Sequence, residues 1–201
     1  MGKKARVVTY YTDDRYKALA DRMVASVMHF GFEAKAYARE NPTGTWMAGM
    51  NLKPQVILDA MTEFPGESIF FIDADCVMLQ EPKMLDEDTH DCDIAACFDE
   101  PRKPCSPIVW LKGTTTLKHV QFWVEDMKKH PGRLDDYVCL WNVMAHCKPK
   151  ARVLHLPPSY AWVEEWHRSR FGPIQPVIWH DAVGEHKTID LTWKKTSASL
   201  F

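Results

Sequence analysis

The sequence contains no apolar run long enough to cross a membrane. A transmembrane helix needs about 20 consecutive apolar residues, and no segment of the 201 residues approaches that length. The N-terminal segment 1–6 is basic, but only Val7 and Val8 follow it before polar residues return. We therefore expect no signal peptide and no membrane span. We expect a cytoplasmic protein, in the host cytoplasm if the source is viral.

An excess of charge of one sign is also missing. The chain has 25 Lys and Arg against 27 Asp and Glu, a formal net charge of −2. A protein that coats nucleic acid non-specifically is normally basic, so the composition disfavours that class. Apolar residues make up 46% and charged residues 26% of the chain, fractions that exclude a disordered, collagen-like or coiled-coil protein. The length suits a single domain covering residues 1–201.

Cysteine pairs with metal-site spacing are absent. The six cysteines form no Cys-x-x-Cys pair and no zinc-type pattern. Cys76, Cys97 and Cys139 lie inside apolar stretches. Because intracellular thiols are normally reduced, we expect mostly buried free thiols rather than disulfides.

Hydrophobic patterning predicts alternating strands and helices. Short apolar runs bounded by turn residues are typical of buried strands, and apolar residues at spacings of three and four indicate a helix between Asp13 and Gly31. Segments 41–49 and 166–172 are expected to be loops. This order favours an α/β fold with a mostly parallel sheet and helices on both faces. The predicted strands are 5–10, 33–38, 68–72, 93–98, 108–111, 153–156 and 177–179, and the further helices are 54–61, 117–130 and 136–146.

Two carboxylates follow the apolar strand 68–72 directly. Ligands of open α/β sheets bind at the carboxyl ends of strands, and residues i and i+2 of an extended segment point the same way. Asp73 and Asp75 are therefore expected to face one Mg²⁺ or Mn²⁺ ion together. The alternative is that Asp73 caps the strand and Asp75 is a solvated turn residue.

Several other residues each have a functional and a structural explanation, and the sequence does not decide between the two. His180 is a third metal ligand or a satisfied histidine at a strand end, and Lys53 contacts phosphate or is merely solvated. Asp135 directly precedes the predicted helix 136–146, where capping alone explains an aspartate, and Asp136 is the first residue of that helix. Trp162, Trp166 and Trp179 belong to the core or stack on a sugar or base.

These motifs resemble the nucleotide-diphospho-sugar glycosyltransferases of the GT-A fold. The segment 72–75, with Lys53-Pro54 upstream, resembles their Asp-x-Asp motif and the lysine before it. The segment 134–137 is similar to an acidic pair that precedes a helix in the family, and 177–187 resembles its His…Gly…Lys segment. Three residues separate His180 from Gly184 where two are usual.

The resemblance implies a Rossmann-like GT-A domain whose residues 1–100 bind the nucleotide sugar and whose residues 101–201 form the acceptor side. It implies a glycosyltransferase of the hexosyltransferase type, with retention favoured over inversion, that uses Mn²⁺ or Mg²⁺ and a nucleotide-diphosphate sugar, with UDP preferred by family habit. The acceptor is a hydroxyl group, on a glycan or, as in phage-type modification, on a hydroxylated base of DNA. The implied roles are metal binding by Asp73, Asp75 and His180, donor binding by Tyr10, Thr12, Asp13, Tyr16, Lys53, Asp73 and Lys187, and catalysis by Asp135 and Asp136.

Two other functions remain open at this point. The segment 73–77 also matches the nucleophile motif of haloacid-dehalogenase-like phosphohydrolases, in which Asp73 would attack phosphorus and Asp75 would act as acid and base. That motif usually opens a chain, whereas here about seventy residues precede it. A non-catalytic module that binds a nucleotide sugar would keep an aromatic pocket without needing a metal.

Overall fold

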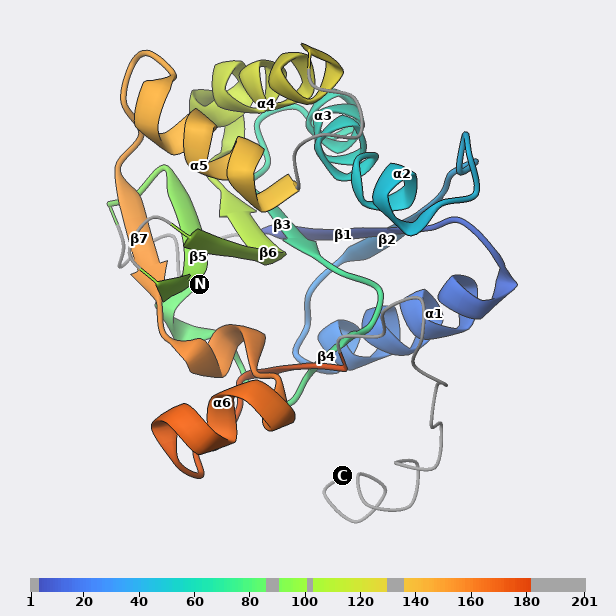
Figure 1. Ribbon diagram of the computed structural model, residues 1–201, viewed down its shortest axis with the longest axis vertical. Helices are drawn as coiled ribbons and strands as arrows, with labels where there is room; N and C mark the ends of the chain where they lie inside the picture. Colours follow the sequence, from blue (N-terminus) through green and yellow to red (C-terminus); the bar gives the residue numbers. More distant parts are fainter. Residues whose placement is uncertain (1–3, 86–90, 101–102, 130–135, 182–201) are drawn as a thin grey trace.

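A six-stranded sheet forms the centre of the protein (Figure 1). The structure, a computed structural model, describes residues 4–85, 91–100, 103–129 and 136–181. The strand order is β2-β1-β3-β6-β5-β7, and β6 runs antiparallel to both of its neighbours while the other pairs are parallel. The expected mostly parallel α/β sheet is confirmed. Its strands are β1 (Arg6–Tyr11), β2 (Ala34–Ala38), β3 (Ile69–Ile72), β5 (Ile94–Glu100), β6 (Lys103–Leu111) and β7 (Val153–Leu156).

Helices cover both faces of this sheet, as expected. Three helices pack on one face and α1 lies on the other, below the sheet in Figure 1. The alternation of side chains along β3 explains the two layers: Ile69 and Phe71 face the first, Phe70 and Ile72 the second. Burial on both faces is the reason that β3 is a continuous apolar run. The helices are α1 (Asp14–His29), α2 (Trp46–Met50), α3 (Lys53–Glu63), α4 (Leu117–Lys129), α5 (Asp136–His146) and α6 (Glu164–Phe171).

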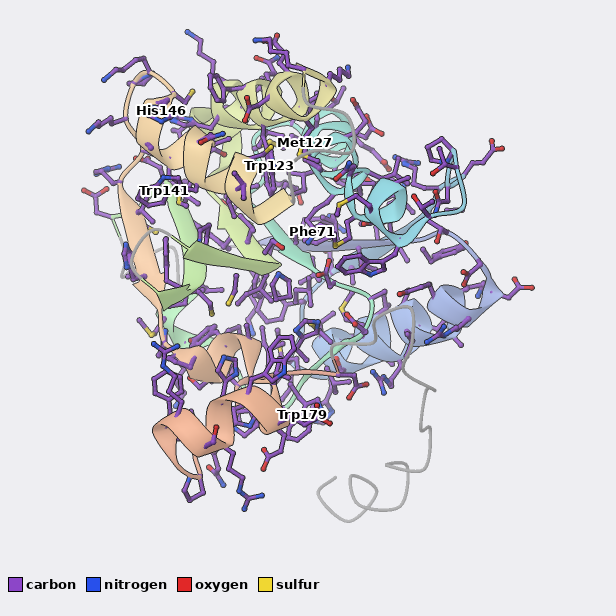
Figure 2. All side chains as sticks on the ribbon, viewed as in Figure 1. Phe71, Trp123, Met127, Trp141, His146 and Trp179 are labelled. Carbon is purple, nitrogen blue, oxygen red and sulfur yellow. The ribbon has the colours of Figure 1, made fainter. Side chains whose placement is uncertain are left out.

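The larger core lies between the sheet and the helices α3, α4 and α5. Phe71 of β3 faces this layer, and Trp123 and Met127 of α4 pack into it (Figure 2). Burying a large apolar side chain contributes roughly 1.5–3 kcal/mol, so this layer supplies much of the driving force for folding. Through Ile69 and Phe71, this core packs against β3, the strand that leads to the two carboxylates.

A second, two-stranded sheet lies beside α1. It consists of β4 (Cys76–Met78) and β8 (Ile178–His180), which pair antiparallel. Cys76 is paired with His180 and Met78 with Ile178. The sequence predicted β8 but not β4. This small sheet brings the end of the described chain to the residues that follow β3.

Three further expectations are wrong in detail. Residues 46–50, expected to be loop, form α2, whose N-terminus is capped by Thr45 Oγ1 accepting from Ala48 N at 3.3 Å. Residues 164–171, also expected to be loop from 166, form α6. Strand β6 begins at Lys103 rather than at 108, and pairs through 103–105 with β5 alone.

The cysteines and the helix lengths bear on two remaining expectations. All six cysteines are free thiols, and five of them are buried, as expected. None of the helices within the described ranges combines the length and the apolar character that crossing a bilayer requires.

Candidate functional site

The two aspartates after β3 lie in a turn and not in an extended segment. Asp73 N still donates to Pro107 O of β6 at 2.8 Å, and the turn that follows is closed by Cys76 N, which donates to Asp73 O at 3.0 Å. The strand therefore ends at Ile72, and the expectation that Asp73 and Asp75 share one extended strand is wrong. Each carboxylate instead has its own cationic or potentially cationic neighbour.

Lys53 neutralises Asp73. Its ammonium lies 3.2 Å from each oxygen of the Asp73 carboxylate and donates to Ser106 O at 2.9 Å. The lysine is only 2% exposed although it begins helix α3. A buried ammonium needs a paired anion and hydrogen-bond acceptors to offset its desolvation. Lys53 is therefore a component of the site and not the solvated lysine of the alternative interpretation.

Asp75 faces His180. The distance from His180 Nε2 to Asp75 Oδ1 is 3.4 Å, and Asp181 N donates to Asp75 O at 3.0 Å. Asp75 is 8% exposed, so it is not the solvated turn residue of the alternative interpretation. Because β8 pairs with β4, a residue more than a hundred positions away reaches the turn after β3. The structure thus brings together two of the three residues predicted to bind metal.

One ion pair holds the segment after β8 against α1, and a local hydrogen bond from Trp179 orients the Asp181 carboxylate of that pair. Arg22 Nη2 donates to Asp181 Oδ2 at 2.5 Å, and Trp179 Nε1 donates to Asp181 Oδ1 at 2.9 Å. Figure 2 shows Trp179 on this small sheet. The neighbour of His180 is therefore tied to the first helix, which fixes the position of the imidazole relative to Asp75.

Cys76 completes a group of possible metal ligands that the sequence did not predict. The ligand atoms of Asp75, Cys76 and His180 all lie within 4.8 Å of one another. A carboxylate oxygen and an imidazole nitrogen are donors that first-row divalent cations accept, and a thiol adds a softer donor. The arrangement of these atoms therefore fits a divalent cation. No local signal marked Cys76, since its approach to His180 depends on strand pairing.

The charges of the site perturb its titrating groups. Burial lowers the pKa of His180, but the adjacent Asp75 carboxylate, with a smaller contribution from Asp73, raises it by more, so the net pKa is above its usual value. Burial is the larger cause of a raised pKa for Tyr16, and Asp75 adds to it. The Tyr16 hydroxyl therefore stays protonated near these carboxylates and is able to donate a hydrogen bond.

The predicted nucleotide-binding residues gather where β1 leads into α1. Tyr10 donates from its hydroxyl to Gly49 O at 2.9 Å, which ties β1 to α2. Asp13 caps α1, because its Oδ1 accepts from Tyr16 N at 2.8 Å. Thr12 lies between them, half-buried. Capping accounts for Asp13 structurally, and its predicted contact with the ribose stays a prediction.

The structure does not bring the remaining predicted residues to the group formed by Asp75 and His180, or does not describe them. Asp135 and Lys187 lie outside the described residues, and Asp136 is the first residue of α5. Of the three tryptophans, Trp162 is buried core and Trp166 is 60% exposed on α6. Trp162 and Trp179 form an isolated bridge between their backbones.

Comparison with solved structures places this fold among glycosyltransferases. A glycosyltransferase involved in the glycosylation of the major capsid of PBCV-1 superposes with a TM-score of 0.70 at 11% identity, covering 90% of this chain and 94% of that one. The apo form of the glycosyltransferase GlyE of Streptococcus pneumoniae TIGR4 gives 0.62 at 14% identity and covers all of this chain. A second GlyE structure gives 0.62 at 13% identity over 99% of this chain.

The similarity concerns the fold, because these identities are low. This chain spans 61% of the length of GlyE. Models of known protein families and curated protein sequences gave no match. The protein therefore has a glycosyltransferase-like fold.

Proposed function

We propose that this protein is a metal-dependent glycosyltransferase that transfers a sugar from a nucleotide-diphosphate sugar to a hydroxyl acceptor. The observation that carries the proposal is the contact between Asp75 and His180 at the end of β3, next to the Lys53–Asp73 ion pair. The glycosyltransferase-like fold supports it. The pairs lie where ligands of α/β sheets bind, beyond the carboxyl end of a central strand.

Transfer of a sugar leaves negative charge on the departing diphosphate. A divalent cation, when bound by Asp75 and His180, supplies electrostatic stabilisation of that charge. Without the cation, His180 Nε2 lies 3.4 Å from Asp75 Oδ1, and the Asp75 carboxylate raises the pKa of the imidazole despite its burial. Asp73 is held in place by Lys53, and its charge acts on His180, so it would add a second negative charge near the cation.

The chain's other residues have roles in binding and positioning. Tyr10, Thr12 and Asp13 receive the base and ribose at the end of β1, and Tyr16 donates its hydroxyl hydrogen bond beside the carboxylates. Lys187 meets the diphosphate. Asp135 or Asp136 orients the acceptor hydroxyl, or accepts its proton if the enzyme inverts.

The identities of the nucleotide, the cation and the acceptor are more specific parts of this proposal. We propose UDP as the nucleotide, Mn²⁺ or Mg²⁺ as the cation, and retention of configuration, because the His…Lys pattern of 180–187 is similar to that of retaining enzymes. The acceptor is a glycan or a hydroxylated base of DNA. A base in a duplex must be flipped out at a cost of a few kcal/mol, so single-stranded DNA is the better acceptor if the substrate is DNA.

A thermal-shift panel of nucleoside diphosphates, with Mn²⁺ or with EDTA, tests the proposal. Ligand at about a hundred times its dissociation constant stabilises a protein by about 2.7 kcal/mol, which is readily measured. We expect one nucleotide to stabilise the protein only with Mn²⁺, and Asp75→Asn to abolish the effect. Asp126→Asn, on the opposite side of the sheet in α4, is the matched control and should retain it.

The other two candidate functions give different results in the same samples. Nucleotide binding that is unchanged by EDTA and by Asp75→Asn would favour a non-catalytic module. Release of phosphate from an aryl phosphate, lost in Asp73→Asn, would favour a phosphohydrolase. Either result would contradict the proposed transfer.

A further inference from the structure

Cys76 is a component of the candidate site whose chemistry the proposed function does not use. Its thiol is fully buried in the layer that contains Ile72 and Ile178. It is paired with His180 across the β4–β8 sheet, so both side chains stand on the same face of that sheet. Asp75 precedes it in the turn. The thiol is thus the most deeply buried of the three possible ligands.

We propose that Asp75, Cys76 and His180 form a mixed oxygen, sulfur and nitrogen site that binds a thiophilic divalent cation of the Zn²⁺ class more tightly than Mg²⁺ or Mn²⁺. The proposal deepens the proposed function, because it shares Asp75 and His180 with it. The three ligand atoms lie within 4.8 Å of one another. Donors at about 2.0–2.3 Å from one zinc ion lie roughly 3–4 Å apart in a tetrahedron, so small side-chain movements suffice.

Charge balance favours such a site at this depth. A carboxylate and a thiolate together neutralise a doubly charged cation, whereas an uncompensated ion is costly in a buried position. Asp73 is not needed for this balance, because Lys53 already neutralises it at 3.2 Å. Binding forms bonds from the metal to an Asp75 oxygen, the Cys76 sulfur and a nitrogen of neutral His180; the proton of the Cys76 thiol leaves to solvent, as does the extra proton of any imidazole that is protonated.

Ligand softness supplies the selectivity. Thiolate ligands select zinc and similar cations, while Mg²⁺ and Mn²⁺ prefer carboxylate, carbonyl and water oxygens. A site with a sulfur donor therefore discriminates against the ions proposed for catalysis. Zn²⁺ bound here takes Asp75 and His180 away from Mn²⁺, and we expect it to compete with Mn²⁺ for the protein.

Optical absorption of the full chain titrated with Co²⁺ alone tests this proposal. Co²⁺ replaces zinc in such sites and gives a thiolate-to-metal charge-transfer band in the near ultraviolet. We expect the band in the wild type and its loss in Cys76→Ser. Cys139→Ser makes the same change at another fully buried cysteine, in the core on the opposite face of the sheet, and should keep the band.

Affinity measurements complete the test. Cys76→Ser should weaken Zn²⁺ binding by roughly tenfold or more while changing Mn²⁺ affinity little. Cys76→Ala, which adds no hydroxyl to the core, should do the same and covers the case in which the serine variant does not fold. Co²⁺ binding without a Cys76-dependent band, or no Co²⁺ binding, would overturn the proposal. No nucleotide is present, so failure of the glycosyltransferase proposal would leave the band unchanged.

Discussion

Replacing Lys53 with methionine should destabilise the protein through the carboxylate that the lysine neutralises. The separation of 3.2 Å corresponds to an attraction of about 5 kcal/mol at an effective dielectric constant of about 20. Asp73 has a side chain that is 25% exposed, so water offsets part of this loss. Ser106 O also loses a donor, which costs about 1 kcal/mol. We expect Lys53→Met to lose about 2–3 kcal/mol of unfolding free energy.

A double-mutant cycle isolates the interaction of this pair. Asp73→Asn leaves a buried ammonium without its anion, whereas Lys53→Met combined with Asp73→Asn leaves neither charge. The double variant should therefore lose about 2 kcal/mol less than the sum of the two single variants. Urea unfolding in EDTA measures all four proteins. A coupling below about 0.5 kcal/mol would refute the reasoning that Lys53 is a neutralising partner.

An exposed lysine provides the control for this cycle. Lys35 pairs with Glu63, and both side chains are about 40% exposed. Exposed ion pairs contribute only about 0–1 kcal/mol, so Lys35→Met should change the unfolding free energy by less than half as much as Lys53→Met. Equal losses would mean that burial does not set the strength of the Lys53 contact.

Two further predictions concern parts of the fold away from the site. Hydrogen bonds from Arg152 hold the pKa of Asp93 below its usual value, so the stabilisation exists at neutral pH and is lost as the pH falls through the lowered pKa. Asp93→Asn should therefore cost stability at pH 6, and urea unfolding at successively lower pH should show this cost shrinking as the carboxylate becomes protonated. Gly113 has φ of +38°, and a Cβ there would lie 3.1 Å from Gly66 O, so Gly113→Ala should lower the unfolding free energy by about 1–2 kcal/mol. Gly44 also has a positive φ but lies in open space, so Gly44→Ala should lower the unfolding free energy by less. Equal losses in the two variants would exclude the close approach to Gly66 as the cause.

The central strand and its polar end were predictable from local sequence. Ile69–Ile72 is apolar at each position because both faces of β3 are buried, and the aspartates follow where the strand ends. Helix α6 was missed because His167 is its one buried residue, so no apolar stripe marks it. Hydrophobic periodicity arises because one face of an element is buried. A helix that lies on the surface therefore shows little periodicity in its sequence.

The prolines of strand β6 explain why the predicted strand 108–111 is shorter than the observed one, Lys103–Leu111. Pro104 and Pro107 lie in the first half of the strand, where a proline normally argues against a central strand. In the structure 103–105 pair with β5 alone, and the register shifts between Phe98 and Glu100. The first half of β6 therefore has the character of an edge strand, which tolerates proline.

Contacts across the chain were less predictable than the elements. The approach of Asp75 to His180 was expected from a family resemblance, and the placement of Cys76 was not expected at all. Both depend on the pairing of β4 with β8, which joins segments a hundred residues apart. A three-residue strand such as β4 carries too little pattern to predict its partner.

The most direct test of the account measures whether Mn²⁺ and the nucleotide bind together. Reciprocal coupling requires that a nucleoside diphosphate raise the affinity for Mn²⁺ by the same factor by which Mn²⁺ raises the affinity for the nucleotide. Electron paramagnetic resonance of free Mn²⁺, titrated with protein with and without UDP and corrected for UDP alone, gives this factor. We predict a factor of at least about ten in the wild type and a factor near one in Asp75→Asn. Equal factors in the two proteins would contradict the claim that Asp75 holds the cation that binds the diphosphate.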